Sequence, residues 1–180
     1  MLNLGFIIIS PDGNIGGLKN TIRSIRIDYE KEPIICCANK SIKSTPYKEM
    51  KSICEVYKGG NTITSLINKG FEKCPTEWAI LLMEGSRICK NLKNKYSKWI
   101  NNEKDIIYPL IVDYNINGYP SKINDTFYNC TLNGLCINKN FFKSVGNLSE
   151  SPLETSRFFW ALDAKEKGAI FKCILGIKIC

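Results

Sequence analysis

The run Trp78–Met83 is apolar throughout, begins after Pro75-Thr76 and ends at the polar turn Glu84-Gly85-Ser86. A short run without polar alternation predicts a strand that is buried on both faces, which requires helices on both sides of a sheet. In open α/β sheets, ligands bind at the carboxyl ends of such strands. The turn is therefore a candidate site, and a solvated turn after a core strand is the alternative interpretation.

Other apolar runs and helical stripes alternate along the chain. We predict strands at 4–10, 34–38, 53–57, 105–113, 126–138 and 169–180, and helices at about 17–25, 62–73, 89–100, 140–145 and 152–167. Residues 48–55 are ambiguous and are read as a short helix running into the strand 53–57, and residues 114–125 are a hairpin or a loop. This order predicts an α/β fold with a mainly parallel central sheet and helices on both faces. Residues 34–37 and 80–83 should be interior strands. In the last helix, the predicted apolar positions are Phe158, Phe159, Ala161 and Leu162.

Length and cysteine usage limit the class of protein. The 180 residues are predicted to form a single domain, 1–180. We see no signal peptide and no apolar run near the roughly 20 residues that span a bilayer. The nine Cys are odd in number, lack a Cys-x-x-Cys pair and are accompanied by no His, which argues against zinc and against a disulfide framework. Reduced thiols and a cytoplasmic location are expected.

The net charge of +8 permits binding to an anionic polymer. The lysines are scattered, however, and no nucleic-acid-binding motif accompanies them, so binding to nucleic acid is not favoured.

Five motifs occur in a recognisable order. They are an opening strand and first helix at 5–10 and 18–25, Asn68-Lys69-Gly70 before the central strand, Glu84-Gly85-Ser86 after it, a short helix ending in Val145-Gly146, and a last helix ending at 164–168. In this order, the chain resembles the inverting family-2 glycosyltransferases over essentially its whole length. The resemblance implies the GT-A, or nucleotide-diphospho-sugar transferase, fold: a three-layer sandwich.

The resemblance also implies roles for individual residues. A nucleotide-diphospho-sugar would be held by polar side chains at the matched positions: Ser10, Asp12, Asn39, Asn68 and Ser86. Apart from the resemblance, Lys58 and Arg87 could neutralise the leaving diphosphate in place of a metal ion, because a guanidinium pairs bidentately with phosphate. Glu84 would be the ligand of a divalent cation, Mn²⁺ or Mg²⁺. Glu154 would be the catalytic base that takes the proton of the acceptor hydroxyl. For Lys58, Arg87, Asn39 and Glu154, solvated charges or local turn and helix-terminus roles are the alternatives.

The chain departs from the family pattern in the residues that matter most for catalysis. Ser86 replaces the second carboxylate of Asp-x-Asp, so we expect weak metal binding. Asn39 replaces the acidic residue near the uracil. At the start of the last helix, a gapless match puts Ser156-Arg157 in the base position, and a small shift puts Glu154-Thr155 there.

Three functions from different classes fit these observations. The first is a glycosyltransferase that acts on a nucleotide-sugar and an acceptor of undefined class. The second is a catalytically degenerate relative that binds a nucleotide-sugar or a partner. The third is a basic-surface binder of anionic polymer.

Overall fold

The computed structural model describes residues 3–88, 92–109, 111–114, 120–124 and 133–174. Its elements are β1 (Leu4–Ser10), α1 (Ile15–Arg26), β2 (Ile34–Ala38), α2 (Ser44–Lys51), β3 (Glu55–Lys58), α3 (Ile63–Lys73), β4 (Trp78–Met83), α4 (Leu92–Trp99), β5 (Asp105–Pro109), β6 (Ile111–Tyr114), β7 (Pro120–Asn124), β8 (Leu135–Asn138), α5 (Lys139–Val145), α6 (Leu153–Glu166) and β9 (Ile170–Ile174).

The main sheet has seven strands in the order β3-β2-β1-β4-β8-β5-β9. Strand β1 pairs in parallel with β2 and β4, β2 pairs in parallel with β3, and β5 pairs in parallel with β9. Only β8, between β4 and β5, is antiparallel to its neighbours in this sheet. The prediction of a mainly parallel sheet with 34–37 and 80–83 as interior strands is confirmed.

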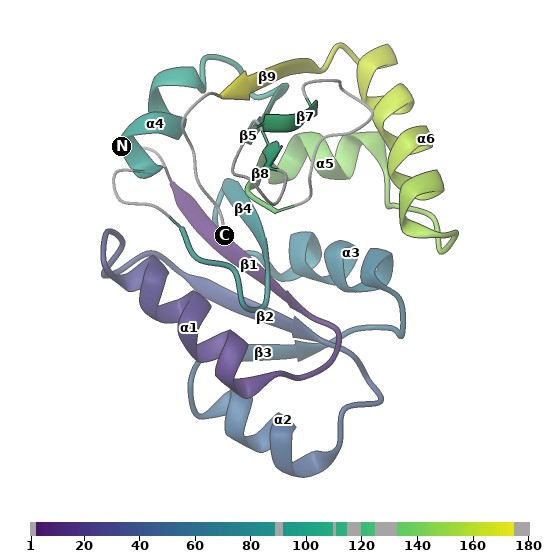
Figure 1. Cartoon of the computed structure of the whole chain (residues 1–180). Helices are drawn as coiled ribbons and strands as arrows, with labels where there is room; N and C mark the ends of the chain where they lie inside the picture. Colours follow the sequence, from purple (N-terminus) through teal and green to yellow (C-terminus); the bar gives the residue numbers. More distant parts are fainter. Residues whose placement is uncertain (1–2, 89–91, 110, 115–119, 125–132, 175–180) are drawn as a thin grey trace.

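Two hydrophobic layers cover the sheet, because side chains of a strand point alternately to its two faces. In β1, Ile7 and Ile9 face the core beneath α3, α5 and α6, whereas Phe6 and Ile8 face the core that includes Leu18 of α1. Figure 1 shows α1 and α2 on one side of the sheet and α3 and α5 on the other. This arrangement explains why β1, β2 and β4 are apolar without alternation.

Local signals begin and end the helices near the predicted positions. The side chain of Asn14 caps α1 by accepting from the Gly17 amide, and Thr62 and Ser65 form a capping box at the start of α3. After α6, Gly168 has a φ of +86°, the left-handed conformation that glycine adopts at helix ends.

The inner face of α6 differs from the prediction. Phe158 and Phe159 are 40% and 58% exposed, whereas Trp160, Ala161 and Ala164 are buried. A helix places residues four apart on one face, so the spacing 156–160–164 faces the sheet and the pair 158–159 does not. The assignment of Phe158 and Phe159 to the apolar inner face was therefore wrong.

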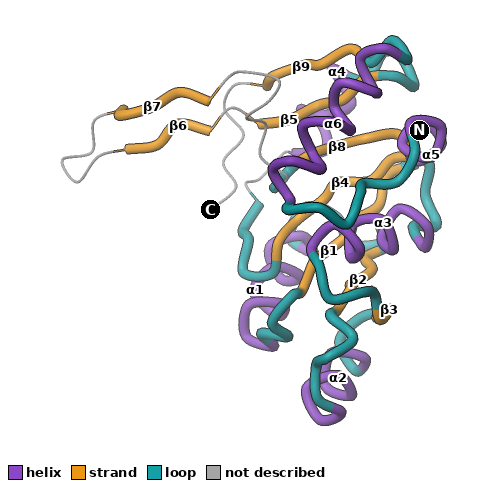
Figure 2. Tube along the Cα trace, turned by 90° about the vertical axis from the view of Figure 1, so that its right-hand side faces the viewer, coloured by secondary structure: helices purple, strands orange, loops and turns teal. Residues whose placement is uncertain are grey.

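The second half of the chain is more divided than predicted. The predicted strand 105–113 is divided into β5 and β6. Strand β6 pairs with β7 in a separate antiparallel sheet (Figure 2), so the hairpin interpretation of this region is confirmed. Strand β8 covers only the end of the predicted strand 126–138, and residues 125–132 and 175–180 lie outside the described part. Early in the chain, α2 begins at Ser44 and β3 occupies Glu55–Lys58 instead of 53–57.

Candidate functional site

The carboxyl ends of β1, β2 and β4 bring three of the predicted site residues together. Ser10 ends β1, Asn39 follows β2 and Glu84 follows β4, and these strands are neighbours in the sheet. The Asn39 amide donates to the Ser10 carbonyl at 3.3 Å, and the Glu84 amide donates to the Ile9 carbonyl at 2.9 Å. Ser10, Asn39 and Glu84 therefore lie at one edge of the sheet although they are far apart in sequence.

The Glu84 carboxylate is held by the loop between β1 and α1. Its Oε2 accepts from the Ser10 hydroxyl at 2.5 Å and from the Asn14 amide at 2.9 Å, and its Oε1 accepts from the Asp12 amide at 3.2 Å. Burial raises the pKa of Glu84 above its usual range, and these hydrogen bonds oppose that shift. Glu84 thus connects the end of β4 to the loop after β1.

The turn after Glu84 is fixed by α1 and by a residue near β8. Gly85 has a φ of +91°, and its amide donates to the Thr21 hydroxyl at 2.9 Å. Ser86 is buried, and its hydroxyl donates at 2.9 Å to the Asn133 side-chain oxygen, which also accepts from the Met83 amide at 3.2 Å. Ser86 therefore faces Asn133 instead of joining Glu84.

The side chains of Asn39, Lys58 and Arg87 differ in exposure: Asn39 is half-buried, whereas Lys58 and Arg87 are exposed. The Asn39 side-chain oxygen accepts from the amide and hydroxyl of Ser41, each at 2.9 Å. Lys58, at the end of β3, is exposed, and its Nζ lies 4.6 Å from the centroid of the Tyr47 ring. Arg87 is exposed directly after the Ser86 turn.

Asn68 has a clear structural role. Its amide group donates to the Leu148 carbonyl at 2.8 Å, and its oxygen accepts from the Leu148 amide at 2.9 Å. This pair joins α3 to the segment after α5, so the side chain of Asn68 is already engaged within the protein.

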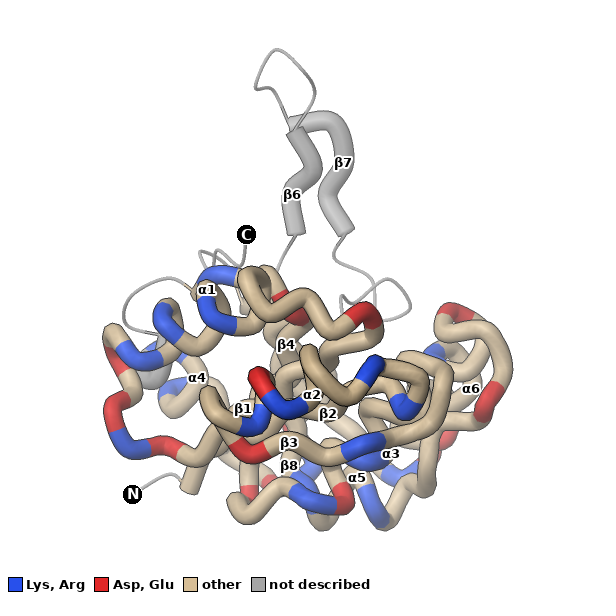
Figure 3. The backbone as a smooth tube through the Cα atoms, turned by 90° about the horizontal axis from the view of Figure 1, so that it is seen from below, with Lys and Arg blue, Asp and Glu red and all other residues tan. Residues whose placement is uncertain are grey.

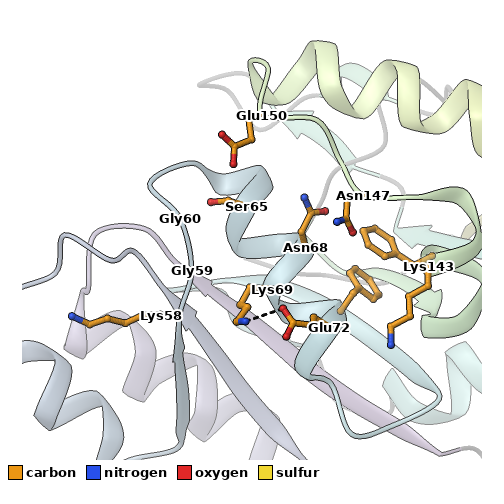
Figure 4. Close-up of a pocket in the computed structure, with 12 residues that line it drawn as sticks. Lys58, Gly59, Gly60, Ser65, Asn68, Lys69, Glu72, Lys143, Asn147 and Glu150 are labelled. Atoms are coloured by element: carbon orange, nitrogen blue, oxygen red, sulfur yellow. Dashed lines mark hydrogen bonds and ion pairs between the residues drawn. The ribbon is translucent and has the colours of Figure 1, made fainter.

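A groove of about 430 Å³ runs along the outer side of α3 (Figure 4). Its lining comes from the loop after β3, from α3, from α5 and from the segment before α6, and includes Lys58, Lys69, Lys143, Asn147 and Glu150. Lys69 pairs with Glu72 at 2.8 Å, and the stacked rings of Phe71 and Phe142 lie against the groove. The volume is within the range of small-molecule sites.

Glu154 lies in the first turn of α6 and is exposed. It is absent from the lining of the groove, although Glu150, four residues earlier, belongs to it. The structure thus brings Ser10, Asp12, Asn39, Glu84 and Ser86 to one edge and leaves Glu154 on a different element.

The residues present do not fit a divalent-cation site built from protein ligands. Mg²⁺ and Mn²⁺ prefer several anionic oxygen ligands, but Glu84 is the only carboxylate in the Glu84-Gly85-Ser86 turn, and it already accepts three hydrogen bonds. Asp12 on the neighbouring loop is the other carboxylate close enough for its charge to raise the pKa of Glu84. The described residues contain no group of three or more His, Cys, Asp or Glu side chains that could hold a metal ion.

Three contacts at this edge were not anticipated from the sequence. Asn14, Thr21 and Asn133 hold the loop or the turn through hydrogen bonds. Asn14 belongs to the run Pro11-Asp12-Gly13-Asn14, and these residue types are typical of turns, so a turn can be predicted there from the sequence. No local pattern marks Thr21 or Asn133, because their partners are 64 and 47 residues away in the chain.

Comparison with known proteins supports the predicted fold but does not assign the chain to a family. No protein-family model matches the sequence, and no curated protein matches it. Structures of S. aureus TarS do superpose: TarS 1-349 in complex with UDP has a TM-score of 0.69 and 10% identity over 96% of this chain. The UDP-GlcNAc complex of TarS 1-349 gives 0.70 and 10%, and a longer TarS chain gives 0.70 and 11%.

This chain spans 58% of the TarS 1-349 chain bound to UDP and 35% of the longer TarS chain. The shared part is the α/β sandwich, so the predicted GT-A-like fold is confirmed. No helix in the described ranges combines the length and apolar character needed to cross a bilayer.

Proposed function

We propose that this protein binds a nucleotide-diphospho-sugar at the carboxyl edge of β1, β2 and β4 and acts as a glycosyltransferase. The observation that carries this proposal is the fold-level similarity to TarS, whose structures include complexes with UDP and with UDP-GlcNAc. The meeting of Ser10, Asp12, Asn39 and Glu84 at the strand edge supports it further, because ligands of α/β sheets bind there.

In this proposal, the nucleotide and the diphosphate are recognised by different residues. The Asn39 side-chain NH2 group would donate to the edge of the base, because the Asn39 oxygen already accepts two hydrogen bonds from Ser41. Lys58 and Arg87, both exposed, would neutralise the diphosphate as it departs. Transfer would be a direct displacement at the anomeric carbon, with inversion.

The acceptor would enter from the groove beside α3. Glu154 lies in the first turn of α6, four residues after Glu150 of the groove lining. Its carboxylate would take the proton of the attacking hydroxyl. Binding without catalysis is the second candidate. It is favoured by one observation: Glu84 and Ser86 both have partners within the protein, so the turn has no spare carboxylate for the chemistry.

Binding to an anionic polymer remains the third prediction. In the view of Figure 3, Lys and Arg residues occur on several helices and are interspersed with Asp and Glu. This distribution does not favour a single basic face in that view.

A binding and turnover experiment separates these functions. Thermal unfolding is measured in the presence of UDP-, GDP- and TDP-sugars. Hydrolysis or transfer of the sugar is measured through the nucleoside diphosphate that it releases. A bound ligand raises the apparent stability by mass action, about 2.7 kcal/mol at a concentration of 100 times Kd. We expect one nucleotide class to stabilise the protein. Stabilisation by heparin or nucleic acid alone would contradict the proposal, and release that survives Glu154→Gln would remove Glu154 as the base.

A further inference from the structure

We infer that Glu84 is a positioning residue, whose carboxylate holds the β1–α1 loop by accepting hydrogen bonds from it. We also infer that a nucleoside diphosphate binds at this edge without a divalent cation. This inference rests on the proposed function for its ligand. Whether a cation binds at Glu84 concerns the protein alone and can be tested without any nucleotide.

The first argument is the hydrogen bonding of the Glu84 carboxylate. Two backbone amides and one hydroxyl point at its two oxygens, from Asp12, Asn14 and Ser10. A carboxylate has about four lone-pair sites, so three of them are used. A cation at Glu84 would have one remaining site on this side chain.

The second argument is the direction of Ser86. A cation shared between Glu84 and Ser86 would need the Ser86 oxygen to face Glu84, yet this hydroxyl donates to Asn133 from a buried position. The same Asn133 oxygen accepts from the Met83 amide, which fixes its orientation. Turning Ser86 toward a cation would break its hydrogen bond to Asn133.

The third argument is the rigidity of the turn. The Gly85 amide is bound to Thr21 on α1, and a Cβ added to Gly17 would lie 3.1 Å from the Gly85 nitrogen. Helix α1 therefore lies directly against the turn, and the turn has little room to rearrange around a metal ion.

The fourth argument is the charge that replaces a cation. Arg87 follows Ser86 directly, is exposed and forms no ion pair within the described part of the chain. A guanidinium binds phosphate oxygens bidentately. Arg87 can therefore supply positive charge to a diphosphate that binds beside the β1–α1 loop, which Glu84 holds in place.

The first experiment uses Mn²⁺ alone and the folded, full chain. Paramagnetic Mn²⁺ is titrated into ¹⁵N-labelled protein, and broadening of the amide signals of Asp12, Asn14 and Gly85 is compared with that of other residues. We expect no selective broadening at these three amides. Selective broadening that is lost in Glu84→Gln would overturn the inference by showing a cation bound to Glu84.

The second experiment measures UDP affinity by calorimetry, once with EDTA and once with Mn²⁺. We expect the two Kd values to agree within about twofold, in the wild type and in Glu84→Gln, and Arg87→Gln to weaken binding about tenfold in both conditions. Lys165→Gln, an exposed lysine on α6, is the control with the same charge change and should leave Kd unaltered.

A wild-type affinity at least tenfold tighter with Mn²⁺, with this gain lost in Glu84→Gln, would overturn the inference and leave the proposed function intact. Absence of UDP binding in both conditions would instead refute the nucleotide part of both proposals, and the Mn²⁺ titration would still decide whether Glu84 binds a cation.

Discussion

The Glu84 carboxylate accepts hydrogen bonds from residues 70 to 74 positions away, and it is half-buried at the edge of the sheet. At the scale of single residues, such a group links protonation to folding. Burial gives Glu84 a higher pKa in the folded state than in the unfolded chain, where glutamate titrates at about 4.3. The folded state therefore binds the proton more tightly.

This linkage predicts the sign of a pH effect. The stabilising contribution of the raised pKa is fully present below a pH of about 4.3 and is lost as the pH rises through the folded pKa. We expect the difference in unfolding free energy between the wild type and Glu84→Gln to shift against the wild type as the pH rises through that window. Urea unfolding at several pH values measures it.

Glu72 provides a control of opposite sign. Hydrogen bonds from Lys69 and then Lys73 lower the pKa of Glu72 to about 2. Its contribution is present above the unfolded pKa and is lost as the pH falls toward the folded one. The difference between the wild type and Glu72→Gln should therefore move in favour of the wild type as the pH rises. Equal slopes for both variants would contradict the assignment for Glu84.

Asn68 carries the second prediction at this scale. Asn68→Ala leaves the amide and the carbonyl of buried Leu148 without their partner, which costs about 1–3 kcal/mol per unsatisfied group. We expect a loss of unfolding free energy of about 2–4 kcal/mol in urea titrations. Asn147→Ala, an exposed asparagine in the same groove, should change stability by less than about 0.5 kcal/mol. Similar losses in both variants would show that the Asn68–Leu148 pair is not the cause.

At the scale of elements, the turn between β4 and residue 88 depends on Gly85. Its φ is +91° and a Cβ there would meet no atom within 4 Å, so a side chain costs only backbone strain. We expect Gly85→Ala to lower the unfolding free energy by about 1–2 kcal/mol. Gly16→Ala, at an exposed helical position of α1, should instead leave stability unchanged or raise it by up to about 1 kcal/mol. Equal effects would mean that backbone conformation does not distinguish the two sites.

The start of α3 is the second testable element. Thr62 and Ser65 satisfy each other's backbone groups in a capping box. Thr62→Ala removes the side-chain acceptor and should cost about 1 kcal/mol. Thr62→Asp keeps an acceptor and should recover most of this loss. Failure of Thr62→Asp to recover stability would show that the cap is not what the alanine variant removes.

At the scale of the whole molecule, the sandwich buries thiols on both faces of the sheet. Cys36, Cys37, Cys74 and Cys136 are buried, and the cysteines in the described part of the chain are free. Burial raises the pKa of Cys37 to about 12 and also raises that of Cys136. A thiol reagent reacts with the thiolate, so these groups should be slow in the native protein.

We expect most of the nine cysteines to titrate after denaturation without reductant, and the four buried ones to be protected before it. Both counts come from one reagent, used with and without denaturant. A denatured, unreduced protein with a single reactive thiol would contradict the expectation of reduced cysteines.

Much of the fold followed from local patterns. Unbroken apolar runs such as Trp78–Met83 predicted strands covered on both faces, and the alternation of strands with helical stripes predicted a mainly parallel sheet. The meeting of Ser10, Asn39 and Glu84 at one edge is a consequence of this parallel order, because each residue lies at the carboxyl end of its strand and parallel neighbours end on the same side. These features depend on periodicity and chain direction, which a sequence displays directly.

The tertiary structure alone decided the partners of the polar side chains and the inner face of α6. Glu84 bonds to Ser10 across 74 residues, and Asn68 bonds to Leu148 across 80. Such hydrogen bonds need distances and directions that are set only when the strands and helices have packed, and no local spacing encodes them. In α6, Phe158 and Phe159 had the composition of a core pair, but the rotation of the helix on the sheet buried Trp160 and Ala164 instead. The sequence by itself therefore determined where a site could lie, and packing determined that Glu84 is bound within it.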